Sequence, residues 1–430
     1  MRVYLESVGC RLNQAEIEQF ARQLRAYGHT LVATPSEADF ALINTCTVTT
    51  AADSDSRKKI RQLTRAGVSK LIATGCWVTL NPQIALELDS VAQIVPNDEK
   101  DELVRKYLQP VDDPIDLEPL QREIIPGARF RTRAFIKAQD GCNNRCTFCV
   151  TTIARGRSRS RLLDNILADI RAITELSKDD VVPAKEVVLT GVHLGSWGRD
   201  LSPQLNLSDL IKGILQETDV PRIRISSLEP WDIESDFFNL WEDERLCRHL
   251  HLPLQSGCAR TLRNMARKTT PVDFARLLET ARRLIPDVAI TTDIIVGFPG
   301  ESNNDFLESI NYVKEMNFAG GHVFTYSARP GTLAADMSDQ IDYQIRKERN
   351  ATLQEIFMNS KISYQKRFLG STMRVLWESV VESDSNHWQV SGLTDNYLRV
   401  TTLSDQTLWN QITPTKLQKM NGSKIIGQVV

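Results

Sequence analysis

The sequence predicts an α/β protein in three parts, of which the last is all-β. Short apolar runs alternate with helix-forming segments up to about residue 362, and this alternation is typical of parallel sheets. From residue 365 onward the helical signal stops, and β-branched and aromatic residues alternate with polar ones. Such a pattern favours a small all-β barrel.

The first hundred residues repeat one unit three times: an apolar strand, a cysteine directly after it, and a helical segment. The strands are expected at 3–8, 39–44 and 70–74, helices at 16–27 and 54–66, and the cysteines are Cys10, Cys46 and Cys76. The alternation predicts a flavodoxin- or Rossmann-like sheet, whose ligands bind at the carboxyl ends of the strands. The three cysteines would then share a metal site. The alternative is that each is a small buried residue at the end of a strand.

The second part contains six more candidate strands, each but the last followed by helix-forming sequence. They are expected at 133–139, 186–190, 222–226, 249–254, 288–295 and 322–326. Six such repeats predict a partial TIM-type (βα)6 barrel, with its active site in the loops at the carboxyl ends of the strands. We place the domains at 1–108, 128–362 and 365–430, with a proline-containing linker at 109–127.

Composition and charge narrow the class of protein. The 430-residue chain has a formal net charge of −2, which argues against a protein that coats nucleic acid by charge alone. Between Arg129 and Arg161, however, nine basic residues accompany the single acid Asp140. No apolar run approaches the roughly 18 residues needed to cross a bilayer, and no signal peptide is evident. We therefore expect a cytoplasmic protein without a membrane partner, in which the eight cysteines serve as metal ligands or spectators rather than disulfides.

A C-x3-C-x2-C motif follows the first barrel strand and consists of Cys142, Cys146 and Cys149. Cysteine thiolates are the ligands of cubane iron–sulfur clusters, and three protein ligands for four irons leave one iron open to a non-protein ligand. Zinc is the alternative, but zinc sites more often show paired C-x2-C motifs or a histidine partner. No histidine lies between Asp98 and Val192. The spacing therefore predicts a 4Fe–4S cluster.

With these motifs the chain resembles the radical S-adenosylmethionine (SAM) superfamily, and the upstream cysteines make it similar to the methylthiotransferases of that superfamily. It is most similar to the MtaB-like group through GCRLNQ at 9–14, INTCTV at 43–48, RTRAFIK at 131–137 and TDIIVGFPGE at 292–301. The resemblance implies two 4Fe–4S clusters, one on Cys10, Cys46 and Cys76, and one that binds and cleaves SAM on Cys142, Cys146 and Cys149. It also implies that 365–430 is a TRAM domain, a barrel that grips RNA.

By the same resemblance the expected reaction converts N6-threonylcarbamoyladenosine next to the tRNA anticodon (position 37) to its 2-methylthio derivative. SAM would serve both as methyl donor and as radical source. The implied partners are a tRNA anticodon stem-loop, an electron donor such as a flavodoxin or ferredoxin, and a sulfur donor. Alternatives within the family are an aspartate of a ribosomal protein and isopentenyladenosine in tRNA. A non-catalytic iron–sulfur RNA-binding protein is the alternative of another class.

Two further sets of residues are candidates for binding. Strand-end residues are candidate SAM contacts, although glycine and serine also serve loops that merely turn: Gly191, Ser226, Glu229, Gln255 and Asp293. Arginines near the motif and in the last part are candidate RNA contacts, because phosphate binding orients a nucleic acid: Arg155, Arg157, Arg159, Arg161 and Arg399. The alternative for the first four is that they stabilise the fold beside an electron-rich cluster. Cys247 and Cys258 are expected to be spectators.

Overall fold

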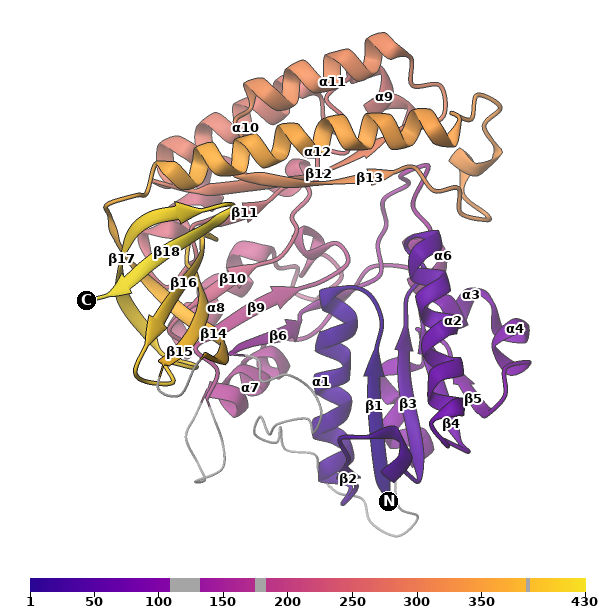
Figure 1. Ribbon diagram of the computed structural model, residues 1–430. Coiled ribbons are helices and arrows are strands. Elements are labelled where there is room, and N and C mark those ends of the chain that lie inside the picture. Colours follow the sequence, from indigo (N-terminus) through magenta and orange to yellow (C-terminus); the bar gives the residue numbers. More distant parts are fainter. Residues whose placement is uncertain (109–131, 175–182, 384–386) are drawn as a thin grey trace.

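A computed structural model describes residues 1–108, 132–174, 183–383 and 387–430, and these form three bodies around a common junction (Figure 1). The predicted linker at 109–127 lies outside the described residues, as do Arg129 and Arg131. Within the described ranges, no helix combines the length and the apolar character that a membrane span requires.

The first body is a five-stranded parallel sheet in the order β2-β1-β3-β4-β5, which is the flavodoxin-like order. Its strands are β1 (Arg2–Ser7), β2 (Thr30–Leu31), β3 (Phe40–Thr45), β4 (Leu71–Gly75) and β5 (Val91–Val95). Its helices are α1 (Arg11–Ala26), α2 (Thr50–Arg65), α3 (Cys76–Leu80), α4 (Pro82–Leu86) and α5 (Leu103–Leu108). The first two helices begin earlier than predicted. For α2 the reason is a cap, because the Thr49 side chain accepts a hydrogen bond from the Ala52 backbone N–H.

The second body contains all six predicted strands, so the partial barrel is confirmed. They are β6 (Arg133–Lys137), β9 (Glu186–Thr190), β10 (Ile223–Ile225), β11 (His249–His251), β12 (Ala289–Val296) and β13 (Gly320–Thr325). They form two parallel sheets, β10-β9-β6 and β11-β12-β13. Single parallel bridges, one of them between Ser227 and His251, join the two sheets. A short antiparallel pair, β7 (Gln139–Asp140) and β8 (Arg159–Ser160), flanks the cysteine motif.

The described residues of this body form seven α-helices: α6 (Thr151–Arg155), α7 (Leu163–Thr174), α8 (Leu207–Glu217), α9 (Ala259–Asn264), α10 (Pro271–Leu284), α11 (Asn303–Glu315) and α12 (Tyr343–Lys366). Their apolar residues recur at helical spacing, as Ile166, Ile170 and Ile173 do on α7, and are buried in the central core. Helix α12 runs through the predicted boundary at 362–365, because no helix-breaking residue occurs before Gly370.

The third body is a closed five-stranded barrel in the order β14-β15-β16-β18-β17, which confirms the predicted all-β barrel. Its strands are β14 (Thr372–Ser383), β15 (His387–Thr394), β16 (Arg399–Ser404), β17 (Ile412–Asn421) and β18 (Lys424–Val429). The alternating pattern is weakest in β17, which contains Pro414 and few apolar residues.

Arginines of the second body hold the barrel against it. Arg222 donates to the carbonyl oxygens of Leu393 (3.1 Å) and Arg374 (2.7 Å). Arg248 pairs with Asp395 at 2.6 Å. These contacts place the β15–β16 turn beside the strand ends of the second body.

Candidate active site at the junction of the three bodies

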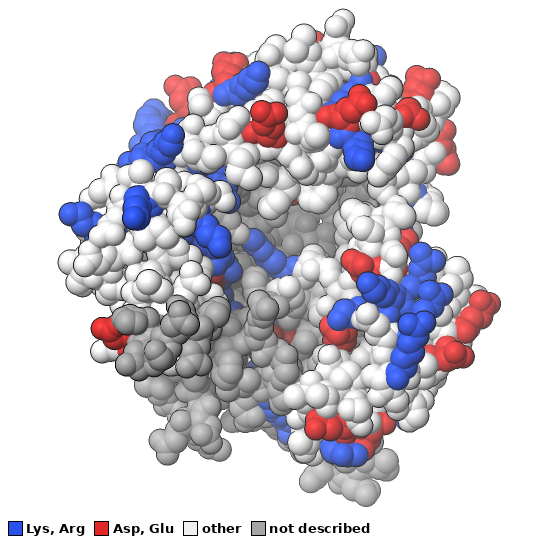
Figure 2. All heavy atoms as spheres, in the orientation of Figure 1, with Lys and Arg blue, Asp and Glu red and all other residues white. Residues whose placement is uncertain are grey.

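A cavity of about 630 Å³ opens where the three bodies meet. The first body contributes Cys10, Cys46 and Cys76, the second contributes strand-end residues, and the third contributes the turn at 396–399. Figure 2 shows the molecule hollowed at this junction. The volume is in the range of small-molecule and cofactor sites.

The structure brings Cys10, Cys46 and Cys76 together, because they follow the adjacent strands β1, β3 and β4. Gly9 permits this approach: its φ is +104°, and a Cβ at this position would lie 2.4 Å from the Cβ of Cys46. Burial, followed by the neighbouring Cys10 and Cys76, raises the pKa of Cys46 to about 11. Cys46 and Cys76 are buried and Cys10 is exposed at the cavity, and a cation or metal would be needed to stabilise their thiolates as cluster ligands.

The second set, Cys142, Cys146 and Cys149, lies in the loop between β7 and α6. Gly141 has a φ of +69°, and a Cβ there would lie 1.9 Å from the carbonyl oxygen of Arg157, so the loop requires glycine. The Asn144 backbone N–H donates to the Cys142 sulfur at 3.4 Å. Burial raises the pKa of Cys146 to about 11.

A buried arginine accompanies each set of cysteines. Arg155 lies beside Cys10 and Cys76, and an Arg267 Nη lies 3.8 Å from the Cys146 sulfur. In the described part of the chain, no three His, Cys, Asp or Glu side chains converge tightly enough for a single metal ion. Each of the two donor sets consists of three cysteine thiols, which is the donor chemistry of an iron–sulfur cluster with one iron left open.

Arg155 belongs to a buried cluster of charges, which favours its alternative role over a contact with RNA. It is 3% exposed and donates to Glu16 and Asp140, each at 2.9 Å. Lys100 and Lys137 approach Glu16 at 2.9 and 3.4 Å. Although burial alone raises the pKa of Glu16, Arg155 and the two lysines hold it well below its usual range. These ion pairs are what the alternative role, stabilising the fold beside the cysteines, requires of Arg155.

The other arginine candidates differ in the solvent exposure of their side chains. Arg161 is half-buried and pairs with Asp169 at 2.8 Å, and Arg159 donates to the Arg155 carbonyl oxygen at 3.2 Å. Arg157 is exposed. Arg399 is exposed at the cavity and pairs with Glu378 at 3.1 Å.

A basic face on α2 was not anticipated. Its exposed residues recur at helical spacing and are Arg57, Lys58, Arg61 and Arg65. Figure 2 shows basic side chains gathered over α2, to the right of the hollow. No carboxylate partner is found for these four residues among those described.

Of the five candidate SAM contacts, Gly191, Ser226 and Asp293 line the cavity. The Ser226 hydroxyl is buried and has no hydrogen-bond partner within the described residues, which suits a residue that faces a ligand. Glu229 instead pairs with Arg267 at 2.6 Å, beside Cys146. Gln255 has a φ of +78° and bridges to β12 through Ile294.

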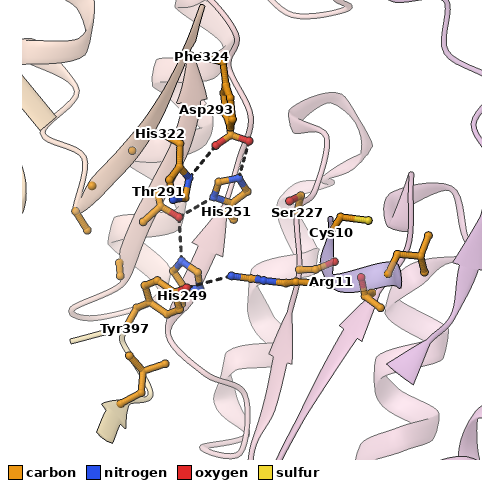
Figure 3. Close-up of a pocket in the computed structure, with 18 of the residues that line it drawn as sticks. Cys10, Arg11, Ser227, His249, His251, Thr291, Asp293, His322, Phe324 and Tyr397 are labelled. Atoms are coloured by element: carbon orange, nitrogen blue, oxygen red, sulfur yellow. Dashed lines mark hydrogen bonds and ion pairs between the residues drawn. The ribbon is translucent and has the colours of Figure 1, made fainter. Parts of the chain in front are cut away.

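A hydrogen-bonded wall of the cavity lies on β11, β12 and β13 (Figure 3), and of its residues only Asp293 was among the candidates named from the sequence. Side chains at alternate positions of a strand face the same side, and the polar and aromatic ones that line the cavity here are His249 and His251, Thr291 and Asp293, and His322 and Phe324. The signal was present, because three of the six histidines of the chain occupy these positions.

Asp293 is the centre of this wall. It accepts hydrogen bonds from His251 and His322, each at 3.1 Å. Although burial by itself raises the pKa of Asp293, these two bonds hold it below its usual range. His249 bonds to Thr291 at 2.9 Å, and burial and then Arg224 hold the pKa of His249 well below its usual range, so His249 is neutral.

Comparisons with known proteins place the chain in a family. Residues 2–96 match the family described as "Uncharacterized protein family UPF0004", and residues 136–313 match the radical SAM superfamily. The chain is 31% identical over 440 residues to a threonylcarbamoyladenosine tRNA methylthiotransferase MtaB of Bacillus subtilis, covering 100% of this chain and 96% of the relative. It is 34% identical to the protein of that name from Thermotoga maritima, over 87% of this chain and 86% of the relative.

A relative with a different name is also similar. A tRNA-2-methylthio-N(6)-dimethylallyladenosine synthase of Clostridium tetani is 29% identical, over 99% of this chain and 96% of the relative. Among solved structures, the radical SAM methyltransferase TsrM of Kitasatospora setae has a TM-score of 0.57 at 14% identity, over 78% of this chain and 75% of that one, which shows a shared fold. The two matched families and the full-length relatives show that the chain belongs to the radical SAM methylthiotransferases and is MtaB-like.

Proposed function

We propose that this protein converts N6-threonylcarbamoyladenosine at position 37 of tRNA to its 2-methylthio derivative, with SAM as methyl donor and radical source. The observation that carries the proposal is a cavity lined both by Cys10, Cys46 and Cys76 and by the strand ends of the partial barrel. A base placed there would lie against Cys10, Cys46 and Cys76 and beside Thr151, which follows the second set of cysteines in the sequence. The full-length relatives with this activity in their names support the choice of nucleoside.

The six cysteines would hold the cofactors, Cys10, Cys46 and Cys76 one 4Fe–4S cluster and Cys142, Cys146 and Cys149 the other. When bound, the clusters supply the one-electron chemistry that cleaves SAM and a site for the sulfur that is transferred. Around the clusters, the residues of the chain bind and orient SAM and the substrate base. Arg155 and Arg267 offset the negative charge of the thiolates, and Ser226, Gly191 and Asp293 are proposed SAM contacts, with Glu229 and Gln255 further from the cavity.

The RNA has to reach the cavity with one base unstacked from its loop. Phe324 lies on the cavity wall and is 42% exposed, and it offers a face on which a base can stack. Phosphates of the anticodon stem-loop would meet the exposed cations on α2, Arg157 and Arg399. An electron donor, such as a flavodoxin or ferredoxin, and a sulfur donor complete the proposed partners.

Mass spectrometry of tRNA nucleosides from a strain lacking the protein tests this proposal. We expect 2-methylthio-N6-threonylcarbamoyladenosine to disappear and to return on complementation. Loss of the methylthio derivative of dimethylallyladenosine instead would assign the protein the activity named for the Clostridium relative. An unchanged nucleoside profile would contradict a tRNA substrate and direct attention to the ribosomal-protein aspartate.

A further inference from the structure

Arg11 crosses the cavity at the junction of the three bodies. It is the first residue of α1 and directly follows Cys10. Its side chain reaches from the first body toward the third, where its Nη donates to the Tyr397 hydroxyl at 3.0 Å (Figure 3). The ring of Tyr397 is held in turn by stacking on His249, with 4.0 Å between the ring centroids. The Arg11 side chain is therefore held at its backbone end by helix α1 and at its guanidinium end by Tyr397.

The charge of Arg11 is not offset by the protein residues that the structure describes. Its single hydrogen bond within them goes to a neutral hydroxyl, and no carboxylate pairs with it. The other arginines of the cavity lining do have acidic partners, since Arg155 pairs with Glu16 and Arg399 with Glu378. The nearby acid, Asp293, already accepts from two histidines. A guanidinium has five N–H donors in a planar fork that matches a carboxylate.

The substrate proposed above carries the matching group, and this inference rests on that proposed function. The threonyl part of N6-threonylcarbamoyladenosine ends in a carboxylate, whereas the dimethylallyl group of the alternative nucleoside is a hydrocarbon. In the adenine ring, N1 lies between C2 and C6, and C6 carries the N6 substituent, so C2 and the N6 substituent lie on the same edge of the base. A carboxylate at Arg11 is therefore compatible with C2 directed toward the neighbouring Cys10.

We propose that Arg11 binds the threonyl carboxylate and so selects N6-threonylcarbamoyladenosine over nucleosides with an uncharged N6 substituent. Tyr397 acts as a positioning residue, because its hydroxyl holds one edge of the guanidinium. Charge-assisted pairs of this kind are strong and geometrically specific. Losing one should weaken substrate binding by about 10- to 100-fold.

The test compares two anticodon stem-loops that differ only in charge. One carries N6-threonylcarbamoyladenosine, and the other carries the same nucleoside with a primary amide in place of the carboxylate. Dissociation constants are measured with cluster-reconstituted enzyme. We expect the wild type to bind the acid about 10- to 100-fold more tightly than the amide. We expect Arg11→Gln to bind both alike, at the affinity of the wild type for the amide.

Two further variants separate recognition of the carboxylate from a general attraction of the cavity for RNA. Tyr397→Phe should reduce the preference for the acid without abolishing it. Lys361→Gln, which removes another cation at the cavity, should weaken binding of the acid and the amide equally. The inference is overturned if the wild type binds both stem-loops equally, or if Arg11→Gln keeps the preference. Formation of methylthio product by the wild type reports on the proposed function separately, since it does not depend on that preference.

Discussion

At the scale of single residues, the two sets of cysteines have different neighbours and different proposed tasks. Cys10, Cys46 and Cys76 line the cavity, whereas Cys142, Cys146 and Cys149 are not among the residues that line it. The second set instead lies beside Arg267 and Glu229. This separation in space is what allows one set to be removed without the other.

Substituting one cysteine from each set tests the division of tasks. Cys142→Ala should abolish SAM cleavage, because the open iron that would bind SAM depends on that set. Cys46→Ala should retain some cleavage but form no methylthio product. Release of 5′-deoxyadenosine and of methylthio nucleoside is measured on the same reconstituted samples. Methylthio product from the Cys46 variant would refute the division.

Glu16 is the residue on which the buried charge cluster depends. Glu16→Gln would leave Arg155, Lys100 and Lys137 buried with less negative charge to balance them. Removing one partner of a buried pair typically costs about 3 to 5 kcal/mol. We expect a clearly lower temperature for the first unfolding transition in calorimetry. Glu37→Gln, at an exposed acid, is the control, and equal transition temperatures for the two variants would contradict this account.

At the scale of elements, the register of β11, β12 and β13 positions the cavity wall. His251 lies opposite Thr291, and Asp293 lies opposite His322, in adjacent parallel strands. Because side chains alternate between the two faces of a strand, residues in register point to the same side. The hydrogen bonds to Asp293 follow directly from this register.

Helix α2 offers a second prediction at this scale. If its basic face contacts phosphates, the double variant Lys58→Gln/Arg61→Gln should weaken binding of the stem-loop and reduce its salt dependence. Each phosphate contact contributes about 0.7 to 0.9 to the slope of log K against log salt, so the slope should fall by about 1.5. Titrations at several salt concentrations measure it. As a control, we substitute exposed cations on α10 and α11 in the double variant Arg283→Gln/Lys314→Gln, which should leave the slope unchanged. An unchanged slope in the α2 variant would exclude a contact between the basic face of α2 and the RNA phosphates.

At the scale of the whole molecule, the cavity exists because three bodies are held together. Arg329 donates to Asp53 of α2 at 2.6 Å, which ties the first body to the second. Arg222, Arg224 and Arg248 donate to the third body. The loop that carries Tyr397 therefore depends on contacts far from it in the sequence.

Arg222→Met tests how the barrel is held. The substitution keeps the apolar stem but removes two hydrogen bonds to barrel carbonyl oxygens, which we expect to cost about 3 kcal/mol of docking free energy. Limited proteolysis should release the segment from about residue 365 onward sooner than in the wild type. Arg283→Met, at an exposed arginine, should leave the cleavage rate as it is. Equal rates for both variants would show that Arg222 does not hold the barrel.

The sequence by itself determined the classes of the three bodies and the position of the two cysteine sets. Strand and helix periods are local, and a cysteine that follows a parallel strand must lie at the carboxyl edge of the sheet. That is why the sheet, the six barrel strands and the all-β barrel could be predicted from patterns of a few residues.

Only the tertiary structure decided which charges are available to a ligand. Arg155 and Arg157 are neighbours in an evenly basic stretch, yet one is buried against Glu16 and the other is exposed. Glu16 is 139 residues away from Arg155, and no local pattern predicts such a pairing. Arg11 meets Tyr397 across 386 residues. Whether a cation is paired or free to bind depends on its burial and its partners, and these follow from how the bodies pack.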